Sequence, residues 1–361
     1  NLPLLLAEKT GKTVAVIGGG ISGLSTAWQL WMKGHEPCIY ESRDELGGKL
    51  TAQVPKSRIP DEVVRYELSR LKENLCQVNL RNNLTREDFQ RIREKFDFVV
   101  IAIGAQRPRL MNIPGAERAL SALDFLQQSK RDRTRVGERV VIIGAGNVGC
   151  DAAAEAGRLG AREITLIDIQ EPASFGKERQ AALAAGARFL YPKFAKAITD
   201  EGVELTDGEI LPADTVIVSI GDLPVLDFLT EDIVTERGFI RVDENYRTSD
   251  PRVFAVGDVV RPGLLTDAIG AGRRAAETID GLLGDRPVIL DQLPPLDRAR
   301  VKMEYFDPRL AGFKDIDACA LNCASCGGCR DCHVCETICP QNAISRQDRE
   351  GLAGHRPGHR H

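Results

Sequence analysis

The chain has 361 residues, a formal net charge of −4, 43% hydrophobic residues and 28% charged residues. This length predicts two or three domains, and the composition excludes a chain that is disordered or collagen-like throughout. The slightly acidic balance counts against a nucleic-acid binder. No apolar run approaches the roughly 18 residues that cross a bilayer, and we recognise no export signal near the start. We therefore expect a cytoplasmic protein, with a trimmed or incomplete N-terminus because the sequence begins at Asn1.

A buried strand, a glycine-rich turn and an apolar helix open the first predicted domain. The strand at 13–18 is followed at once by a G-x-G-x-x-G turn with Gly18, Gly20 and Gly23. Such glycines permit a tight turn and close approach of a pyrophosphate, which the amides of the helix N-terminus bind. The next strand ends at Glu41, where an acid accepts hydrogen bonds from a ribose diol. The segment predicts a dinucleotide site, with a purely structural turn as the alternative.

The same signature appears a second time after the apolar strand at 140–143. Its predicted nucleotide contacts are Gly144, Gly146, Asn147, Val148 and Gly149. The following strand ends at Asp168, whose carboxylate pairs with a free 2′-hydroxyl and repels a 2′-phosphate, so we favour NAD(H) over NADP(H). Arg162, Lys177 and Arg179 are the nearby cations that could still reach a 2′-phosphate. Two complete fingerprints imply two nucleotides.

Three further segments resemble the FAD half of two-dinucleotide flavoproteins. A Gly-Gly pair at 47–48 follows the first ribose acid, and the strand at 97–105 ends in glycine, with Ile103 where Thr is usual. The strand at 248–258 ends in Gly-Asp, and in such proteins this Asp bonds the ribityl chain. A helix then begins that can direct its amides toward the isoalloxazine ring. The resemblance implies FAD contacts at Gly18, Gly20, Ser22, Gly23, Glu41, Gly48, Lys49, Gly104, Gly257, Asp258, Thr266 and Ala268.

Seven of the ten cysteines are concentrated near the C-terminal end. A disulfide framework would require a small secreted domain, so in this long chain the cluster indicates metal ligands. A C-x2-C-x2-C-x3-C-P run, typical of bacterial ferredoxins, predicts a [4Fe–4S] cluster, with zinc as the alternative. The run consists of Cys329, Cys332, Cys335 and Cys339, and the preceding cysteines are Cys319, Cys323 and Cys326. Either one cluster uses the run alone, or two clusters form with a ligand from His333 or a partner chain.

The remaining cysteines, Cys38, Cys76 and Cys150, are isolated in the sequence. We expect them to be ordinary buried cysteines. Cys150 falls at a predicted helix start, where a thiolate is favoured. It lacks the C-x-x-C partner of disulfide-reducing flavoenzymes.

Because FAD-type segments lie on both sides of the second fingerprint, the predicted fold is α/β with two interleaved Rossmann-like domains. We place the FAD-binding domain at 11–135 and 245–290, with an NAD(P)H-binding domain at 136–244 inserted into it. Residues 296–361 are predicted to form a small ferredoxin-like iron–sulfur module and a tail.

The order of these motifs over about residues 11–285 resembles the small subunit of glutamate synthase and its relatives. That group includes the flavin half of dihydropyrimidine dehydrogenase and NADH-dependent ferredoxin:NADP oxidoreductase. The resemblance implies that FAD accepts hydride from a nicotinamide and passes single electrons to iron–sulfur clusters. Two features depart from it: no cysteine precedes Cys38, where the family carries a cysteine-rich segment, and residues 168–170 replace an Arg pair of NADPH-using relatives. The first suggests rewired electron transfer and the second weakens NADPH.

The sequence therefore predicts an FAD-dependent NAD(P)H oxidoreductase. We expect an electron-transfer subunit that moves electrons between NAD(H), FAD and one or two [4Fe–4S] clusters, to or from a partner subunit of a larger complex. No protein acid or base is required, because the cofactor carries the chemistry. Three alternatives stay open: a glutamate synthase small subunit feeding a large subunit, a self-contained flavin reductase of a small molecule, and a non-catalytic electron wire.

Overall fold

The computed structural model describes residues 6–75 and 77–284. The predicted iron–sulfur module with its seven candidate ligands lies outside the described residues, as does Cys76. Within the described ranges, no helix combines the length and the apolar character that crossing a membrane requires.

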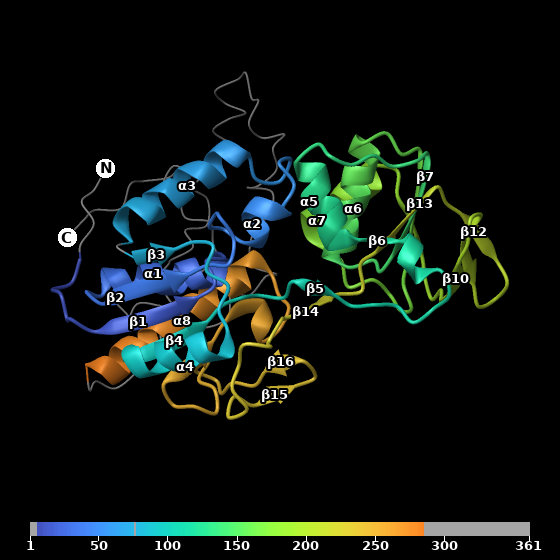
Figure 1. Ribbon diagram of the computed structural model, residues 1–361. Coiled ribbons are helices and arrows are strands. Elements are labelled where there is room, and N and C mark those ends of the chain that lie inside the picture. The colour runs from blue at the N-terminus through green and yellow to red at the C-terminus, as the bar shows by residue number, and fades with distance from the viewer. Residues whose placement is uncertain (1–5, 76, 285–361) are drawn as a thin grey trace, which may run out of the picture. The chain divides into compact units, whose positions relative to one another are not determined.

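The first sheet contains five parallel strands in the order β17-β4-β1-β2-β3. Its strands are β1 (Thr13–Ile17), β2 (Glu36–Tyr40), β3 (Gln77–Asn79), β4 (Phe98–Ile101) and β17 (Val253–Ala255). Helix α1 (Ile21–Met32) packs against α8 (Leu265–Leu283), so segments from both ends of the described chain lie side by side, blue and orange in Figure 1. The late strand β17 pairs with β4 and completes this sheet.

The second sheet repeats this architecture with the parallel order β6-β13-β7-β8-β9. Its strands are β6 (Leu120–Ser121), β7 (Arg139–Ile143), β8 (Glu163–Ile167), β9 (Arg188–Leu190) and β13 (Thr215–Val218). Helix α6 (Asn147–Arg158) follows the second glycine turn and packs against α5 (Ala122–Lys130) and α7 (Gly176–Ala184).

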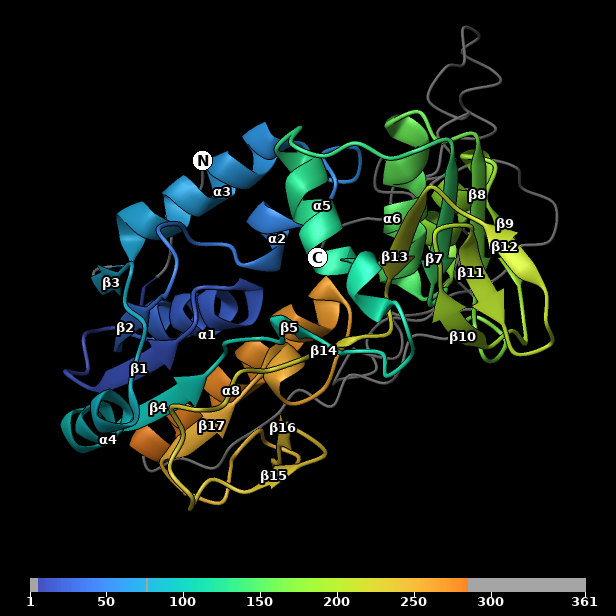
Figure 2. The ribbon, with the colours of Figure 1, turned by 45° about the vertical axis from the view of Figure 1, so that its right-hand side comes forward.

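Two short strands join the parts of the chain that form the two sheets. β5 (Arg107–Pro108) leaves the first sheet and β14 (Asp222–Leu223) returns to it, and the two pair antiparallel (Figure 2). The remaining helices and 3-10 turns are α2 (Lys49–Ala52), α3 (Asp61–Asn74), α4 (Arg86–Lys95), η1 (Ala116–Arg118) and η2 (Gly257–Val259). The remaining strands are β10 (Ala195–Ile198), β11 (Gly202–Leu205), β12 (Ile210–Pro212), β15 (Thr235–Glu236) and β16 (Phe239–Ile240).

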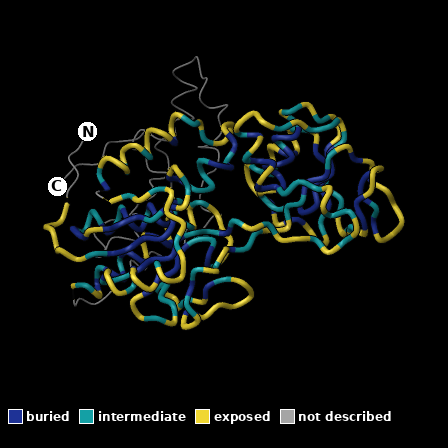
Figure 3. The backbone as a smooth tube through the Cα atoms, in the orientation of Figure 1, coloured by how far each residue is buried: buried dark blue, intermediate teal, exposed yellow. Residues whose placement is uncertain are grey.

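The central strands of both sheets are buried on both faces, which explains their continuous apolar sequences. Val14 and Ala15, which point to opposite faces of β1, are both fully buried, as is Ile142 of β7, and the central strands run dark blue in Figure 3. The predicted fold class, two α/β units with parallel sheets in a two-dinucleotide arrangement, is confirmed. The limits that we gave for the domains stay a prediction.

Candidate functional site

The first glycine turn has the close backbone contacts that its motif requires. Gly18 has a φ of 107°, and a Cβ atom there would lie 2.4 Å from the carbonyl oxygen of Ala102. A Cβ at Gly23 would lie 2.0 Å from the carbonyl oxygen of Gly18, so α1 approaches the turn too closely for any side chain. Gly20 caps α1 without a side-chain hydrogen bond. The first amides of α1 are therefore left for a ligand.

The carboxylate of Glu41 is held beside this turn by three donors. Its Oε2 accepts a hydrogen bond of 2.7 Å from the amide of Gly19. Its Oε1 accepts bonds from the amide of Arg43 at 2.8 Å and from the Ser42 hydroxyl at 3.2 Å. The residue is only 7% exposed. Oε1 accepts two of these bonds and Oε2 only one, so Oε2 can still accept a hydrogen bond from a ribose hydroxyl.

The Gly-Gly pair at 47–48 lies across the first turn. The amide of Gly47 donates to the carbonyl of Gly19 at 2.8 Å, and a Cβ at Gly48 would lie 3.0 Å from the Cα atom of Gly20. A side chain at Gly48 would project onto Gly20 at the N-terminus of α1, and one at Gly47 would meet the side chains of Thr51 and Leu68. The glycines therefore keep open a cradle that fits a dinucleotide pyrophosphate.

The second glycine turn has the same backbone geometry as the first at matching positions. Gly144 has a φ of 106°, and a Cβ at Gly149 would lie 2.1 Å from the Gly144 carbonyl oxygen. Asp168 Oδ2 accepts from the amide of Ala145 at 2.9 Å, as Glu41 does in the first turn. However, Asp168 is only partly buried, and a Cβ at Gly146 would meet nothing within 4 Å. The second turn is therefore open where the first is covered.

One cavity of about 710 Å³ contains residues of both turns. The residues of the predicted FAD set that line it are Gly18, Gly20, Ser22, Glu41, Gly48, Lys49, Gly104, Asp258 and Ala268. From the second fingerprint, Asn147 and Val148 line the same cavity at the N-terminus of α6. The predicted contacts that do not line it are Gly23, Gly144, Gly146, Gly149, Asp168, Gly257 and Thr266.

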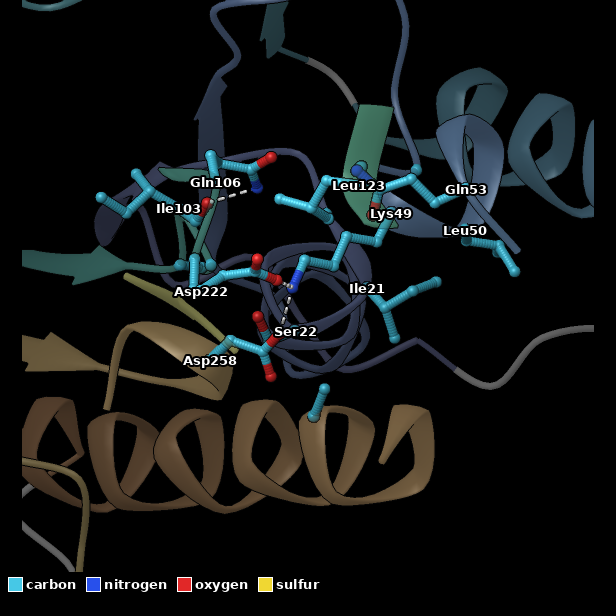
Figure 4. A pocket seen from close by; sticks show the side chains of 18 of the residues that line it. Ile21, Ser22, Lys49, Leu50, Gln53, Ile103, Gln106, Leu123, Asp222 and Asp258 are labelled. Carbon is cyan, nitrogen blue, oxygen red and sulfur yellow. Dashed lines mark hydrogen bonds and ion pairs between the residues drawn. The ribbon is translucent and has the colours of Figure 1, made fainter. Parts of the chain in front are cut away.

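An ion triad lies in the wall of the cavity. Lys49 Nζ is 3.1 Å from Asp258 Oδ2 and 3.2 Å from Asp222 Oδ2, and its side chain points to both carboxylates (Figure 4). Burial raises the pKa of Asp222, and the charge of Lys49 opposes that rise. Asp222 carries no motif signal, because it stands in the two-residue strand β14, so sequence reasoning missed it.

A second ion cluster joins the loop between α2 and α3 to the helices α6 and α7. Arg58, between α2 and α3, contacts Asp151 Oδ2 of α6 at 2.7 Å through Nη1 and Glu178 Oε1 of α7 at 2.5 Å through Nη2. Burial raises the pKa of Asp151 to about 6, against the lowering effect of Arg58. Asp151 and Glu178 also line the cavity. No spacing rule connects these residues, so sequence reasoning missed this cluster as well.

Cys38 and Cys150 are buried free thiols, as expected. Burial raises the pKa of the Cys150 thiol, which opposes the thiolate that a helix start favours. The structure therefore gives Cys150 the features of a packing residue.

The family model and the curated relatives that match this chain are all oxidoreductases. The model of the pyridine nucleotide-disulphide oxidoreductase family matches residues 12–272. The chain is 31% identical to the NADP(+)-dependent formate dehydrogenase subunit beta of Moorella thermoacetica, over 84% of this chain and 48% of that protein. It is 30% identical to a putative glutamate synthase [NADPH] small chain of Cereibacter sphaeroides, over 78% and 80% of the two chains.

A third relative is the NAD-dependent dihydropyrimidine dehydrogenase subunit PreT of Escherichia coli, 29% identical over 75% of this chain and 68% of that one. Among solved structures, the thioredoxin reductase of T. acidophilum matches with a TM-score of 0.59 and 22% identity, over 75% of this chain and 97% of that one. The chain spans about half the length of the Moorella subunit.

Proposed function

Since the chain belongs to the pyridine nucleotide-disulphide oxidoreductase family, we propose that it is the flavoprotein electron-transfer subunit of a larger oxidoreductase. As a member of this family it is an FAD-dependent NAD(P)H oxidoreductase. The observation that carries the proposal is the single cavity that the first turn shares with Asn147 and Val148 of the second. Hydride transfer needs both cofactors to be held against each other, and one shared cavity provides for that.

We assign FAD to the first turn and its covering glycines. The amides of α1 would hold the pyrophosphate, Glu41 the ribose diol, and Asp258 the ribityl chain. When bound, FAD accepts hydride from a nicotinamide and releases electrons singly to one-electron acceptors. The side chains bind and orient the cofactor, and we assign no catalytic acid or base.

We assign NAD(H) rather than NADP(H) to the second turn. Arg162 precedes β8 while Asp168 follows it, so the length of a five-residue strand separates them. Arg179 donates to the carbonyl of Ser174 at 3.4 Å and lies over the ring of Phe189. These positions support a turn that reads a free 2′-hydroxyl through Asp168. The names of the relatives include both nucleotides, and reduction rates with NADH and NADPH measure the preference.

We further propose that the C-terminal cysteines bind one or two [4Fe–4S] clusters that lead electrons to or from the partner. The ferredoxin-type spacing of the last four cysteines supports this assignment. Iron and sulfide analysis of the purified full chain tests it. About four irons per chain indicate one cluster, and about eight indicate two. A chain that contains no iron would contradict the assignment.

Anaerobic stopped-flow mixing with NADH or NADPH tests the function itself. We expect rapid loss of the visible flavin absorbance with NADH, and slower loss with NADPH. Absence of bleaching by either nucleotide would favour the non-catalytic electron wire. Efficient turnover of a natural small-molecule acceptor by the chain alone would instead favour a self-contained reductase.

A further inference from the structure

The ion triad of Lys49, Asp222 and Asp258 has a feature that cofactor binding alone does not require. In the FAD assignment, Asp258 contacts the ribityl chain, and Lys49 follows the glycine pair that covers the first turn. Nothing in that assignment explains Asp222, although it lies 3.2 Å from the Lys49 ammonium. The side chains of Lys49 and Asp222 are 28% and 17% exposed, so water screens this pair only partly.

The backbone fixes the position of Asp222. Strand β14 pairs antiparallel with β5. The amide of Gln106 donates to the carbonyl of Leu223 at 3.1 Å, and the amide of Arg109 donates to the carbonyl of Gly221 at 3.0 Å. Residues on both sides of Asp222 are thus hydrogen-bonded to the same partner segment. The carboxylate is held on the cavity wall by regular structure.

The ammonium of Lys49 lies beside Asp258 and Asp222 in the wall of the cavity. Its own backbone follows Gly48, which contacts the first turn. The side chain extends from there to Asp258, and Asp222, Gln106 and Leu123 line the same cavity (Figure 4). In the FAD assignment, the pyrophosphate lies at the first turn and the ribityl chain at Asp258. The ammonium is therefore on the flavin side of the pyrophosphate.

A charge beside a flavin ring changes the reduction potential of the flavin. Adding two electrons and one proton to a flavin adds one negative charge to its ring. A nearby cation favours that added charge and a nearby carboxylate disfavours it, and charges near the ring nitrogens are a known means of tuning the cofactor. The triad contains one cation and two carboxylates, so each member affects the balance.

We propose that Lys49 and Asp222 set the reduction potential of the bound flavin in opposite directions, Lys49 raising it and Asp222 lowering it. The proposal rests on the assigned FAD site. Both residues act on the flavin through their charges and take no direct part in hydride transfer. The Asp222 side chain is only 17% exposed and lines the cavity, so water screens its charge only partly. Lys49 offsets that charge.

Midpoint potentials of Lys49→Met and Asp222→Asn, measured in anaerobic dye-coupled titrations at saturating FAD, test the proposal. We expect Lys49→Met to lower the equilibrium constant for two-electron flavin reduction about tenfold, a shift of about −30 mV. Asp222→Asn should raise it by a similar factor. Lys196→Met and Asp200→Asn are the matched controls, since each removes one charge from an exposed ion pair outside the cavity. Neither control should shift the potential.

Shifts of the same sign in the two variants, or shifts no larger than those of the controls, would overturn the proposal. If Lys49→Met no longer retains FAD, the rise in Asp222→Asn and an unchanged potential in Lys49→Arg decide the matter. The FAD content of the unaltered chain and its reduction by NADH are measured first. Failure of the proposed function appears there, while failure of the present inference appears only in the signs of the shifts.

Discussion

The two glycine turns have the same backbone and different surroundings. Gly18 and Gly144 have φ values of 107° and 106°, and each turn places an amide on the acid of the following strand. Yet the first turn is covered by the glycines at 47–48, and its acid, Glu41, is buried. In the second turn, nothing lies within 4 Å of a Cβ at Gly146.

The two turns therefore share one backbone geometry, and the surrounding residues enclose the first turn more than the second. A covered cradle fits a cofactor that stays in place. An open turn fits a nucleotide that enters and leaves in each cycle. We therefore expect FAD to remain with the chain during purification and the nicotinamide nucleotide to exchange.

The largest effects should come from the glycine that brings each helix onto its turn. Gly23→Ala and Gly149→Ala both place a Cβ about 2 Å from a carbonyl oxygen, so each should lower the free energy of unfolding by at least about 2 kcal/mol. Gly270→Ala in α8 is the control, because its Cβ meets nothing within 4 Å. That change should leave stability equal or higher. Thermal melts compare the three variants, and a melting temperature unchanged by Gly23→Ala would show that the helix can shift away.

Replacing Glu41 and Asp168, the acids that follow the two turns, should have unequal effects. Glu41→Gln places an amide group opposite three donors in a buried site, so we expect FAD affinity to fall about 100-fold. Asp168→Ala removes a partly exposed carboxylate, and we expect about a tenfold loss of preference for NADH over NADPH with FAD content unchanged. Equilibrium dialysis measures the first effect, and reduction rates with each nucleotide measure the second. An unchanged preference in Asp168→Ala would mean that another group reads the ribose.

The pH dependence of the free energy of unfolding tests the ion cluster in which Arg58 contacts Asp151 and Glu178. The folded-state pKa of Asp151 is about 6, above its ordinary value, because burial disfavours the charged form. Between pH 4 and 6, roughly, the folded chain holds a proton that the unfolded chain has released. Stability from this group is therefore present at low pH and is lost as the pH rises through about 6, by up to about 3 kcal/mol.

The groups that face Asp151 are Arg58, Glu178 and Glu155. Unfolding free energies at pH 5 and pH 7, in the unaltered chain and in Asp151→Asn, isolate its contribution. We expect the unaltered chain to lose more stability than the variant between these pH values. An equal or smaller loss would mean that the carboxyl ionises at its ordinary pKa.

The smallest effect should come from Arg162. It is exposed, pairs with Glu138 at 3.6 Å, and lies at the opposite end of β8 from Asp168. Arg162→Ala should change the ratio of NADPH to NADH reduction rates by less than about twofold. A larger fall with NADPH alone would mean that this side chain reaches a 2′-phosphate.

Sequence reasoning predicted the local structure of both turns correctly, while the nucleotide contacts there stay a prediction. The glycine turns and the acids at 41 and 168 lie within about 25 residues of one another in each half, and sterics restrict their geometry to one arrangement. It failed for contacts between distant segments. Arg58 and Asp151 are 93 residues apart and Lys49 and Asp222 are 173 apart. Such pairs depend on how the returning chain is placed, for which no local pattern exists.

We propose that one cavity brings a nicotinamide nucleotide and a firmly held FAD together. The most direct test is an anaerobic titration of the purified full chain with NADH, following flavin absorbance and bound FAD per chain. We expect one FAD per chain before any addition and complete bleaching of the flavin by NADH, at about one equivalent for the flavin and a further amount for each cluster that is reduced. A chain that holds FAD but is not reduced by NADH or NADPH would contradict it.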